Sequence, residues 1–149
     1  RGQVKDVPRY NLRVITYQTG NDLDLDQIIE LYRASTLGER RPIDDRACME
    51  GMLRHANLVI TAWDGELLVG ISRCMTDFHY ATYCSDLAVR DSHQRMGIGK
   101  ELLRRSLAAG GPKCYLTLLA APKAVNYYGH IGMTNHPSAW IVRQGEPIL

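Results

Sequence analysis

One stretch, residues 85–100, constrains the fold of this chain more than any other part of its sequence. An apolar run typical of a β-strand leads through a short polar turn into Gln94-Arg95-Met96-Gly97-Ile98-Gly99, where a helix is predicted to begin. The apolar residues of this helix are expected on one side: Ile98, Leu102, Leu103 and Leu107. The two glycines let a ligand approach the backbone, and the helix start offers free N–H groups and the positive end of the helix dipole. With Arg95 and Lys100 beside it, the stretch predicts a binding site for phosphate groups.

Two other phosphate-binding patterns do not fit this stretch. The Rossmann pattern requires a third glycine three residues after Gly99, where Leu102 stands. The P-loop requires Ser or Thr after Gly-Lys, and a glycine five places before Gly99, but Glu101 and Gln94 occupy these positions. The remaining structural alternative is a glycine-rich turn from strand to helix with incidental basic residues.

Composition places the chain among ordinary globular proteins. Its 149 residues predict a single domain over 1–149, with residues 1–11 as a loose N-terminal arm. A hydrophobic share of 45%, a charged share of 23% and a net charge of +2 do not indicate a nucleic-acid-binding protein. No apolar run approaches the roughly 20 residues that span a bilayer, and the start of the chain lacks a secretory pattern. We therefore expect a cytoplasmic protein without nucleic-acid or membrane partners.

The four cysteines, Cys48, Cys74, Cys84 and Cys114, lie in apolar or mixed segments and form no Cys-x-x-Cys pair. Buried free thiols are therefore predicted in preference to disulfides. The five histidines lack the spacing of metal ligands, so no metal is expected.

Periodicity and turn residues predict the element order β-α-α-β-β-β-α-β-α-β. Strands are predicted at residues 12–17, 58–63, 66–75, 81–89, 114–119 and 138–142, with Asp64-Gly65 as a hairpin turn. Helices are predicted from Leu25, capped by Asp22 or Asp24, over 44–56, from the Gly-x-Gly turn to Gly110, and from Pro122 to Gly132. The second helix is expected to have Cys48, Met52 and Ala56 down one side, and the strand at 114–119 to be buried on both faces.

A second motif lies downstream, at Ala124-Val125-Asn126-Tyr127-Tyr128-Gly129-His130-Ile131-Gly132-Met133. Together with Gln-Arg-x-Gly-x-Gly, preceded by Leu-Ala-Val and followed by Lys-Glu-Leu-Leu, it closely resembles the signatures of the GCN5-related N-acetyltransferases (GNAT). The familiar second pattern of that family is Ala-x-x-Phe/Tyr-Tyr-x-x-x-Gly-Phe. Ala121 stands where many members have Asn, and Met133 replaces the usual Phe, which is an exchange of one apolar residue for another. The element order fits from about residue 12 to 142, whereas the residue match is confined to 85–103 and 124–133.

The resemblance implies the GNAT fold, an α/β (α+β) class with a central mixed, mostly antiparallel twisted sheet of about six to seven strands and about four helices. It also implies acetyl-CoA as the co-substrate. Its pyrophosphate would lie on the amides of the first motif: Gln94, Arg95, Met96, Gly97, Ile98, Gly99 and Lys100. The pantetheine arm would pair with the backbone of Leu87, Ala88 and Val89, where the sheet has to splay beside a β-bulge. Asn126 and Tyr128 complete the implied cofactor contacts.

The family is known for direct attack of an amine on the thioester, without an acyl-enzyme, so no cysteine is needed. Tyr128 stands where the family often keeps a tyrosine near the sulfur. It is therefore predicted to donate a proton to the departing thiolate, and the alternative is a core aromatic on a helix face. Its neighbour Tyr127 is predicted to be a core residue.

Asp86 is an acidic residue inside an otherwise apolar strand, where an unpaired carboxylate would be costly. It is therefore the first candidate for the general base or for an anchor of the substrate. The alternative is a carboxylate bonded to the backbone or to a hydroxyl such as that of Ser85. Glu39, His79 and a water chain are the other candidates for the base.

The leading functional prediction is an N-acetyltransferase that moves an acetyl group from acetyl-CoA to a primary amine of a small molecule. A protein or peptide N-acetyltransferase and a non-catalytic acyl-CoA-binding regulatory module are the alternatives. Acidic and aromatic residues near the central strand suit a cationic amine: Asp77, Tyr80, Tyr83 and Asp86. Arginines could equally receive a carboxylate: Arg33, Arg40, Arg41 and Arg73. The resemblance also allows a homodimer.

Overall fold

The computed structural model describes residues 13–149, so the predicted arm at 1–11 and Leu12, the predicted start of the first strand, lie outside the described residues. The chain divides into two compact units, of which the larger ends at Leu118 and the smaller is Leu119–Leu149. The larger unit contains the sheet and three of the α-helices, and the smaller one contains short helical turns. A single domain over the whole chain stays a prediction.

The larger unit is built on a five-stranded sheet in the order β1-β2-β3-β4-β5. The strands are β1 (Ile15–Thr19), β2 (Leu58–Asp64), β3 (Leu67–Thr76), β4 (Ala81–Val89) and β5 (Tyr115–Leu118). The first four strands pair antiparallel with their neighbours, and β5 pairs parallel with β4. The predicted mixed, mostly antiparallel sheet is confirmed, although the described residues form five strands, fewer than expected.

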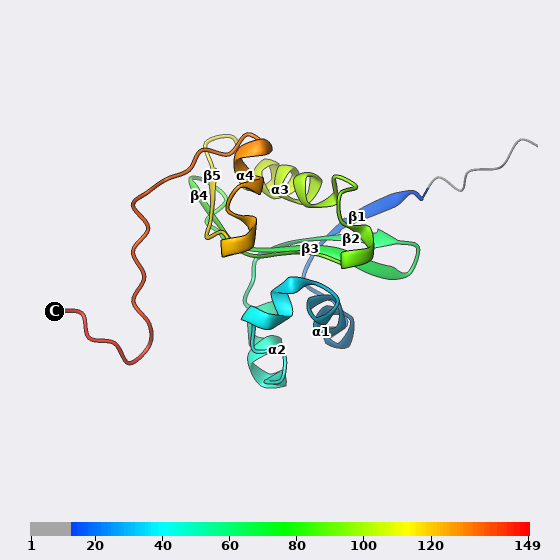
Figure 1. Cartoon of the computed structure of the whole chain (residues 1–149), viewed down its shortest axis with the longest axis horizontal. Coiled ribbons are helices and arrows are strands. Elements are labelled where there is room, and N and C mark those ends of the chain that lie inside the picture. The colour runs from blue at the N-terminus through cyan, green and yellow to red at the C-terminus, as the bar shows by residue number, and fades with distance from the viewer. Residues whose placement is uncertain (1–12) are drawn as a thin grey trace, which may run out of the picture. The chain divides into compact units, whose positions relative to one another are not determined.

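Helices cover both faces of this sheet (Figure 1). α1 (Leu25–Arg33) and α2 (Arg46–Arg54), with the 3-10 turn η1 (Thr36–Arg40) between them, lie on one face, and α3 (Ile98–Ala109) lies on the other. α1 begins as predicted because the Asp24 carboxylate accepts a hydrogen bond from the backbone N–H of Asp26 at 2.9 Å. Its buried stripe is Ile28, Ile29, Leu31 and Tyr32.

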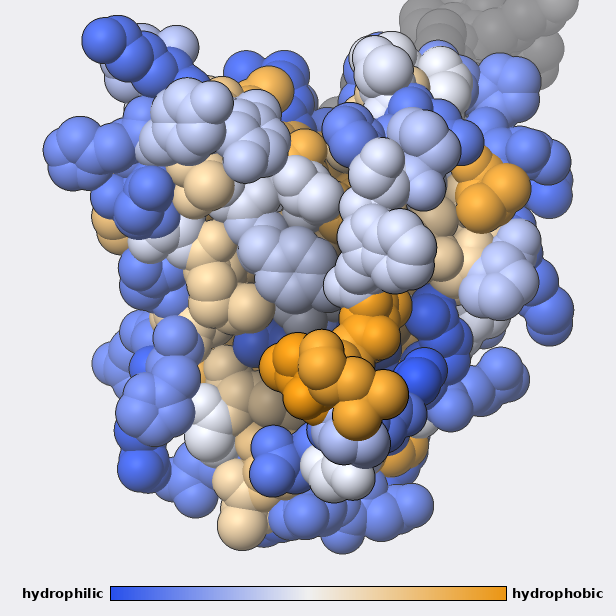
Figure 2. Space-filling model, turned by 90° about the vertical axis from the view of Figure 1, so that its left-hand side faces the viewer, coloured by the Kyte–Doolittle hydropathy of each residue, from blue (hydrophilic) through white to orange (hydrophobic). Residues whose placement is uncertain are grey.

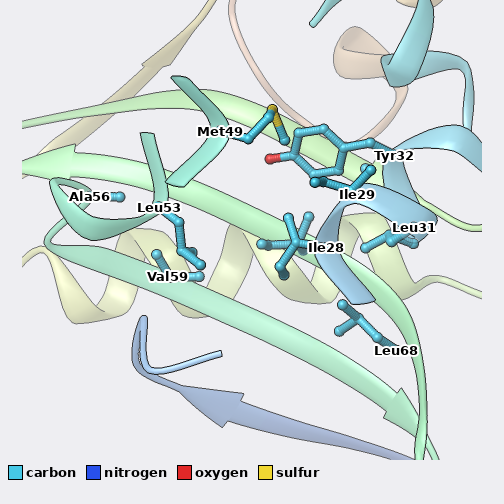
Figure 3. Close-up of a cluster of buried hydrophobic side chains, with 11 residues drawn as sticks. Ile28, Ile29, Leu31, Tyr32, Met49, Leu53, Ala56, Val59 and Leu68 are labelled. Carbon is cyan, nitrogen blue, oxygen red and sulfur yellow. The ribbon is translucent and has the colours of Figure 1, made fainter. Parts of the chain in front are cut away.

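The apolar core under α1 and α2 is one contiguous cluster (Figure 3). Its members come from α1, α2 and the strands and include Ile28, Tyr32, Met49, Leu53, Val59, Leu68 and Ile71. The predicted inner side of α2 is wrong at Cys48, which is exposed. The Asp45 side chain caps the backbone N–H of Cys48, and this helix start turns Met49 and Leu53 inward. Among the other thiols, Cys74 and Cys84 are buried as predicted, whereas Cys114 is half-buried.

α3 packs closely against the opposite face of the sheet. Leu107, predicted on its inner side, is 44% exposed, because Ser106 occupies that side and its hydroxyl lies 2.7 Å from that of Ser72. A Cβ on Gly70 of β3 would lie 3.0 Å from side-chain atoms of both Ile98 and Leu102. The missing side chain at Gly70 therefore lets the first turns of α3 lie directly on the sheet.

The C-terminal part of the chain departs most from the sequence prediction. β5 is an edge strand and Tyr115 is 52% exposed, so the prediction of a strand buried on both faces is wrong. The predicted helix from Pro122 is divided into a 3-10 turn, η3 (Pro122–Ala124), and a short helix, α4 (Tyr127–His130). Residues 138–142 form no strand in the described chain, and Trp140 is 93% exposed. β-Prone composition alone does not make a strand, because its N–H and C=O groups need a neighbouring strand to complete a ladder.

Figure 2 shows a face with many hydrophilic side chains around its rim and its largest group of strongly apolar side chains just below the centre. Among residues 13–149, no helix is long and apolar enough to cross a bilayer. The same part of the chain contains no group of three or more His, Cys, Asp or Glu side chains that could hold a metal ion.

Candidate active site

The predicted β-bulge is present in β4. The ladder between β3 and β4 pairs Arg73 with Asp86 and Cys74 with Cys84, which leaves Ser85 as an extra residue between the two pairs. An extra residue in one strand bends that strand and increases its twist. The bulge therefore divides β4 into two segments at Ser85.

The predicted splay of the sheet is present at the same point. β4 pairs with β5 from Ala81 to Cys84, and the last pair joins Cys84 and Leu118. Beyond it, β4 has no strand neighbour on its β5 side within the described sheet. Within the described sheet, the backbone of Leu87–Val89 is therefore without a strand partner on this side, which we call the free edge of β4, and an extended ligand can add there like another strand.

The turn from β4 into α3 leaves a row of backbone amides uncommitted. After the 3-10 turn η2 (Asp91–His93), Arg95 has a φ of 61° and Gly97 a φ of 80°, both in the left-handed region. Within residues 13–118, no atom accepts a hydrogen bond from the backbone N–H groups of residues 95–100. Successive amides in such turns form concave anion-binding nests, and the start of α3 adds the positive end of its dipole. These residues therefore fit the phosphates of an extended ligand.

The side chains of this turn divide into anchors and exposed groups. Ile98 is buried at 2% exposure and fastens the helix start to the sheet. The Gln94 amide donates to the Asp91 carboxylate at 3.0 Å and to the Val89 carbonyl at 3.3 Å. Arg95 and Lys100 are exposed, and so are Met96 and Gly97. Two cations thus flank the open amides, as a site for phosphates requires.

Asp86 lies fully buried at the centre of a network of side chains. Its carboxylate accepts hydrogen bonds from the Nε atoms of Arg41 and Arg73, at 2.5 Å each, and from the Tyr32 hydroxyl at 2.7 Å. Burial is the largest single influence and raises the pKa of Asp86, but the bonds and charges of Arg73, Tyr32 and Arg41 together leave this pKa below its usual value. Asp86 is therefore ionised at neutral pH and engaged by three donors. This environment favours a structural carboxylate over a base, with arginines and a tyrosine as partners in place of Ser85.

The way in which these groups meet was not predicted from the sequence. Arg41 and Arg73 were named among four arginines that could receive a carboxylate of the substrate, and in the structure both bind the carboxylate of Asp86. Tyr32 was not among the residues predicted for the site. Arg41 and Tyr32 are 45 and 54 residues from Asp86 in the chain, so no local pattern links them. The one available signal was an acidic residue in an apolar strand.

The buried thiols lie on the other face of β3 and β4. Hydrogen bonds from Cys84 and then Ser72 lower the pKa of the Cys74 thiol to about 7, against the effect of burial. The Cys74 side chain nevertheless has no exposed surface, so a substrate cannot reach it.

The second motif lies in the smaller unit. The rings of Tyr127 and Tyr128 on α4 meet edge to face, with centroids 5.3 Å apart and an interplanar angle of 72°. Tyr127 is 40% exposed, so its prediction as a core residue is wrong, and Tyr128 is half-buried. The roles of Tyr128 and Asn126 at the cofactor stay predictions.

The remaining candidates lie elsewhere in the larger unit. Glu39 is exposed in η1. His79 lies in the turn between β3 and β4, where its ring Nδ1 is 2.8 Å from the carbonyl oxygen of Asp77. The Asp77 carboxylate accepts hydrogen bonds from the backbone N–H groups of Tyr80, His79 and Ala81, which lower its pKa to about 2. Asp77 is thus bonded within its own turn, as Asp86 is within its network.

Comparison with known proteins agrees with this geometry. The acetyltransferase (GNAT) family matches residues 25–133. No curated protein matches the chain by sequence. Among solved structures, a GNAT family acetyltransferase from Streptococcus pneumoniae is 25% identical, with a TM-score of 0.63 over 88% of this chain and 100% of its own.

Two further structures share the fold at lower identity. An acetyltransferase from Trypanosoma brucei is 21% identical, with a TM-score of 0.61 over 87% of this chain and 99% of its own. The aminoglycoside N-acetyltransferase AAC(6')-Iy, in complex with CoA, is 17% identical, with a TM-score of 0.70 over 93% of this chain and 99% of its own.

The family match spans most of the chain. It includes the bulged strand β4, its free edge, the open amides of residues 95–100 and the tyrosine motif of α4. The chain therefore belongs to the acetyltransferase (GNAT) family and is an acetyl-CoA-dependent acyltransferase.

Proposed function

We propose that this chain transfers the acetyl group of acetyl-CoA to a primary amine of a small molecule. The observation that carries the proposal is the free edge of β4, which runs directly into the open amides of residues 95–100. An extended pantetheine arm suits a free strand edge, and a pyrophosphate suits a concave row of N–H groups at a helix start. An aminoglycoside N-acetyltransferase of the same fold supports a small amine as the acceptor.

In the proposed reaction the amine nitrogen attacks the carbonyl carbon of the thioester. As the C–N bond forms, the carbonyl oxygen becomes negative, and a backbone N–H of Leu87–Val89 donates a hydrogen bond to it. The C–S bond then breaks, and the thiolate takes a proton for which the Tyr128 hydroxyl is the proposed donor, after which the tyrosinate regains a proton from the water that accepts the amine proton. The amine gives its proton to water, because Asp86 is already engaged by three donors.

The proposal is tested by calorimetric titration with acetyl-CoA, CoA and NADH, followed by thiol release from acetyl-CoA with a panel of amines. We expect acetyl-CoA and CoA to bind, NADH not to bind, and thiol release to depend on a small primary amine. Release with peptide amino termini alone would replace the acceptor class with peptides. Binding without release from amines or peptides would favour a regulatory acyl-CoA-binding module, and absence of acetyl-CoA binding would overturn the site.

A further inference from the structure

The extra residue of the β4 bulge is held by two arginines. The Nη2 atom of Arg41 donates to the Ser85 carbonyl at 2.6 Å, and the Nη2 atom of Arg73 donates to the Ser85 hydroxyl at 3.0 Å. The Nε atoms of the same two arginines bind the two oxygens of Asp86. Each guanidinium thus bridges the bulge residue and the carboxylate that follows it.

The two arginines reach the bulge from different parts of the fold. Arg73 belongs to β3 and is paired directly with Asp86 in the ladder, where its side chain is 8% exposed. Arg41 follows η1, between α1 and α2, and its side chain is 21% exposed. Arg41 therefore links a segment outside the sheet to the residue at which the sheet splays.

We propose that Arg41 is a positioning residue for acyl transfer, which fixes the bulge at Ser85 so that the free edge of β4 is correctly aimed at the thioester. This inference rests on the proposed function, because that edge is where the pantetheine arm and the carbonyl oxygen would bind. Arg41 acts through Ser85 and Asp86 and needs no contact with either substrate.

The chemistry of the contact requires arginine and not merely a positive charge. A guanidinium is planar, and its Nε and Nη2 atoms are held at a fixed spacing, so one group can bind a carboxylate and a carbonyl together. An ammonium group is a single point of charge on a flexible stem and cannot hold both acceptors in one plane. Without Arg41, Asp86 keeps the bonds from Arg73 and Tyr32, both at Oδ2, whereas Asp86 Oδ1 and the Ser85 carbonyl each lose the donor that Arg41 supplies. The expected loss is therefore one of geometry at the bulge together with some stability, so kcat is compared per folded molecule.

The test compares Arg41→Ala and Arg41→Lys with the wild-type chain, and with Arg54→Ala as the matched control. Arg54 lies at the end of α2 and makes an exposed ion pair with Glu50 at 2.7 Å. Because misplacement of a reacting group by about 1 Å can cost two orders of magnitude in rate, we expect kcat to fall about 100-fold in both Arg41 variants. The Kd for CoA, measured by calorimetry, is expected to stay within about threefold, since residues 95–100 are unchanged. Arg54→Ala should keep the wild-type kcat.

Added guanidinium ion gives a readout that a general loss of folding would not give. It is expected to raise the kcat of Arg41→Ala, where the space is empty, and to leave Arg41→Lys and the wild type unchanged. A wild-type kcat per folded molecule in Arg41→Ala, or a lost kcat that guanidinium does not restore, would overturn the inference. An absence of thiol release in the wild type with every amine would instead overturn the proposed function itself, and this inference with it.

Discussion

The Asp86 network and the turn at residues 95–100 are both polar, yet they are built in opposite ways. In the network, side chains fill one another's hydrogen-bonding capacity inside the core. In the turn, backbone N–H groups face outward and have no acceptor within residues 13–118. A buried charge has to be satisfied because an unpaired one costs several kcal/mol, whereas an exposed amide can bind water until a ligand replaces it. In this fold, the polar groups that have hydrogen-bond partners hold β4 in place. The amides that have no acceptor within residues 13–118 are available to the substrate.

The largest expected effect concerns the Asp86 network. Asp86→Ala would leave the charges of Arg41 and Arg73 buried without their carboxylate, and we expect a loss of about 3–5 kcal/mol in the free energy of unfolding. Urea denaturation measures this loss. The control is Asp44→Ala, which removes a carboxylate that is 93% exposed and is expected to cost less than about 1 kcal/mol. Similar losses in the two variants would show that the network does not stabilise the fold.

The next largest effect concerns the turn at residues 95–100. Gly97→Glu would place a carboxylate at the anion-binding amides, and we expect CoA to bind more than about 100-fold more weakly, a change of about 2.7 kcal/mol. The matched control is Gly65→Glu, because Gly65 also has a positive φ and a Cβ at either position meets nothing within 4 Å. Calorimetry with CoA compares the two variants. Equal Kd values for the two variants would show that the phosphates of CoA do not bind at residues 95–100.

A smaller effect tests how much one hydrogen-bond donor contributes to the Asp86 network. Tyr32→Phe removes one donor to Asp86, and we expect a loss of about 1.5–3 kcal/mol at neutral pH. The pKa of Asp86 in the folded chain lies below its unfolded value of about 3.9, so its stabilisation is complete above that pH and is lost as the pH falls through the folded pKa. Because the variant raises this folded pKa, its acid unfolding should begin at a higher pH.

Circular dichroism over a pH titration measures the acid midpoint of Tyr32→Phe. The control is Tyr83→Phe on β4, whose side chain is 38% exposed. An unchanged midpoint in Tyr32→Phe would show that the tyrosine hydroxyl does not help to keep Asp86 ionised.

The smallest expected effect concerns the proposed proton donor. Tyr128→Phe should lower kcat about tenfold, which is more than it should weaken the binding of CoA. The pKa of a phenol, about 10, exceeds that of a thiol, about 8.5, so the hydroxyl mainly donates a hydrogen bond to the thiolate. Tyr127→Phe is the control and should keep its rate. A wild-type kcat in Tyr128→Phe at saturating substrates would leave Tyr128 with a structural role alone.

Local patterns predicted the elements that position the open turn. The apolar spacing from Leu25 to Tyr32 and the cap at Asp24 gave α1, and Asp64-Gly65 gave the turn between β2 and β3. The Gly-x-Gly turn predicted the start of α3 because its signals lie within a few consecutive residues. Backbone sites of this kind can be predicted from sequence, since neighbouring residues build them.

The Asp86 network could not be predicted in the same way. Whether Asp86 meets Arg41 depends on how η1 is placed on the sheet, which the residues around Asp86 do not encode. The strand predicted at 138–142 is absent from the described sheet for a related reason. Its composition favours a strand, but it has no neighbouring strand there. Both outcomes depend on contacts between distant parts of the chain.

The extra residue at Ser85 also interrupts the alternation of side chains between the two faces of the sheet along β4. In a regular strand, side chains two residues apart point to the same face, yet Cys84 lies beside Ser72 on the α3 face and Asp86 reaches Tyr32 on the α1 face. With an unbroken ladder, Asp86 would stand opposite Ser72, away from the guanidinium of Arg73. One inserted residue therefore places the Cys84 thiol and the Asp86 carboxylate, two positions apart in the chain, in separate layers of the fold.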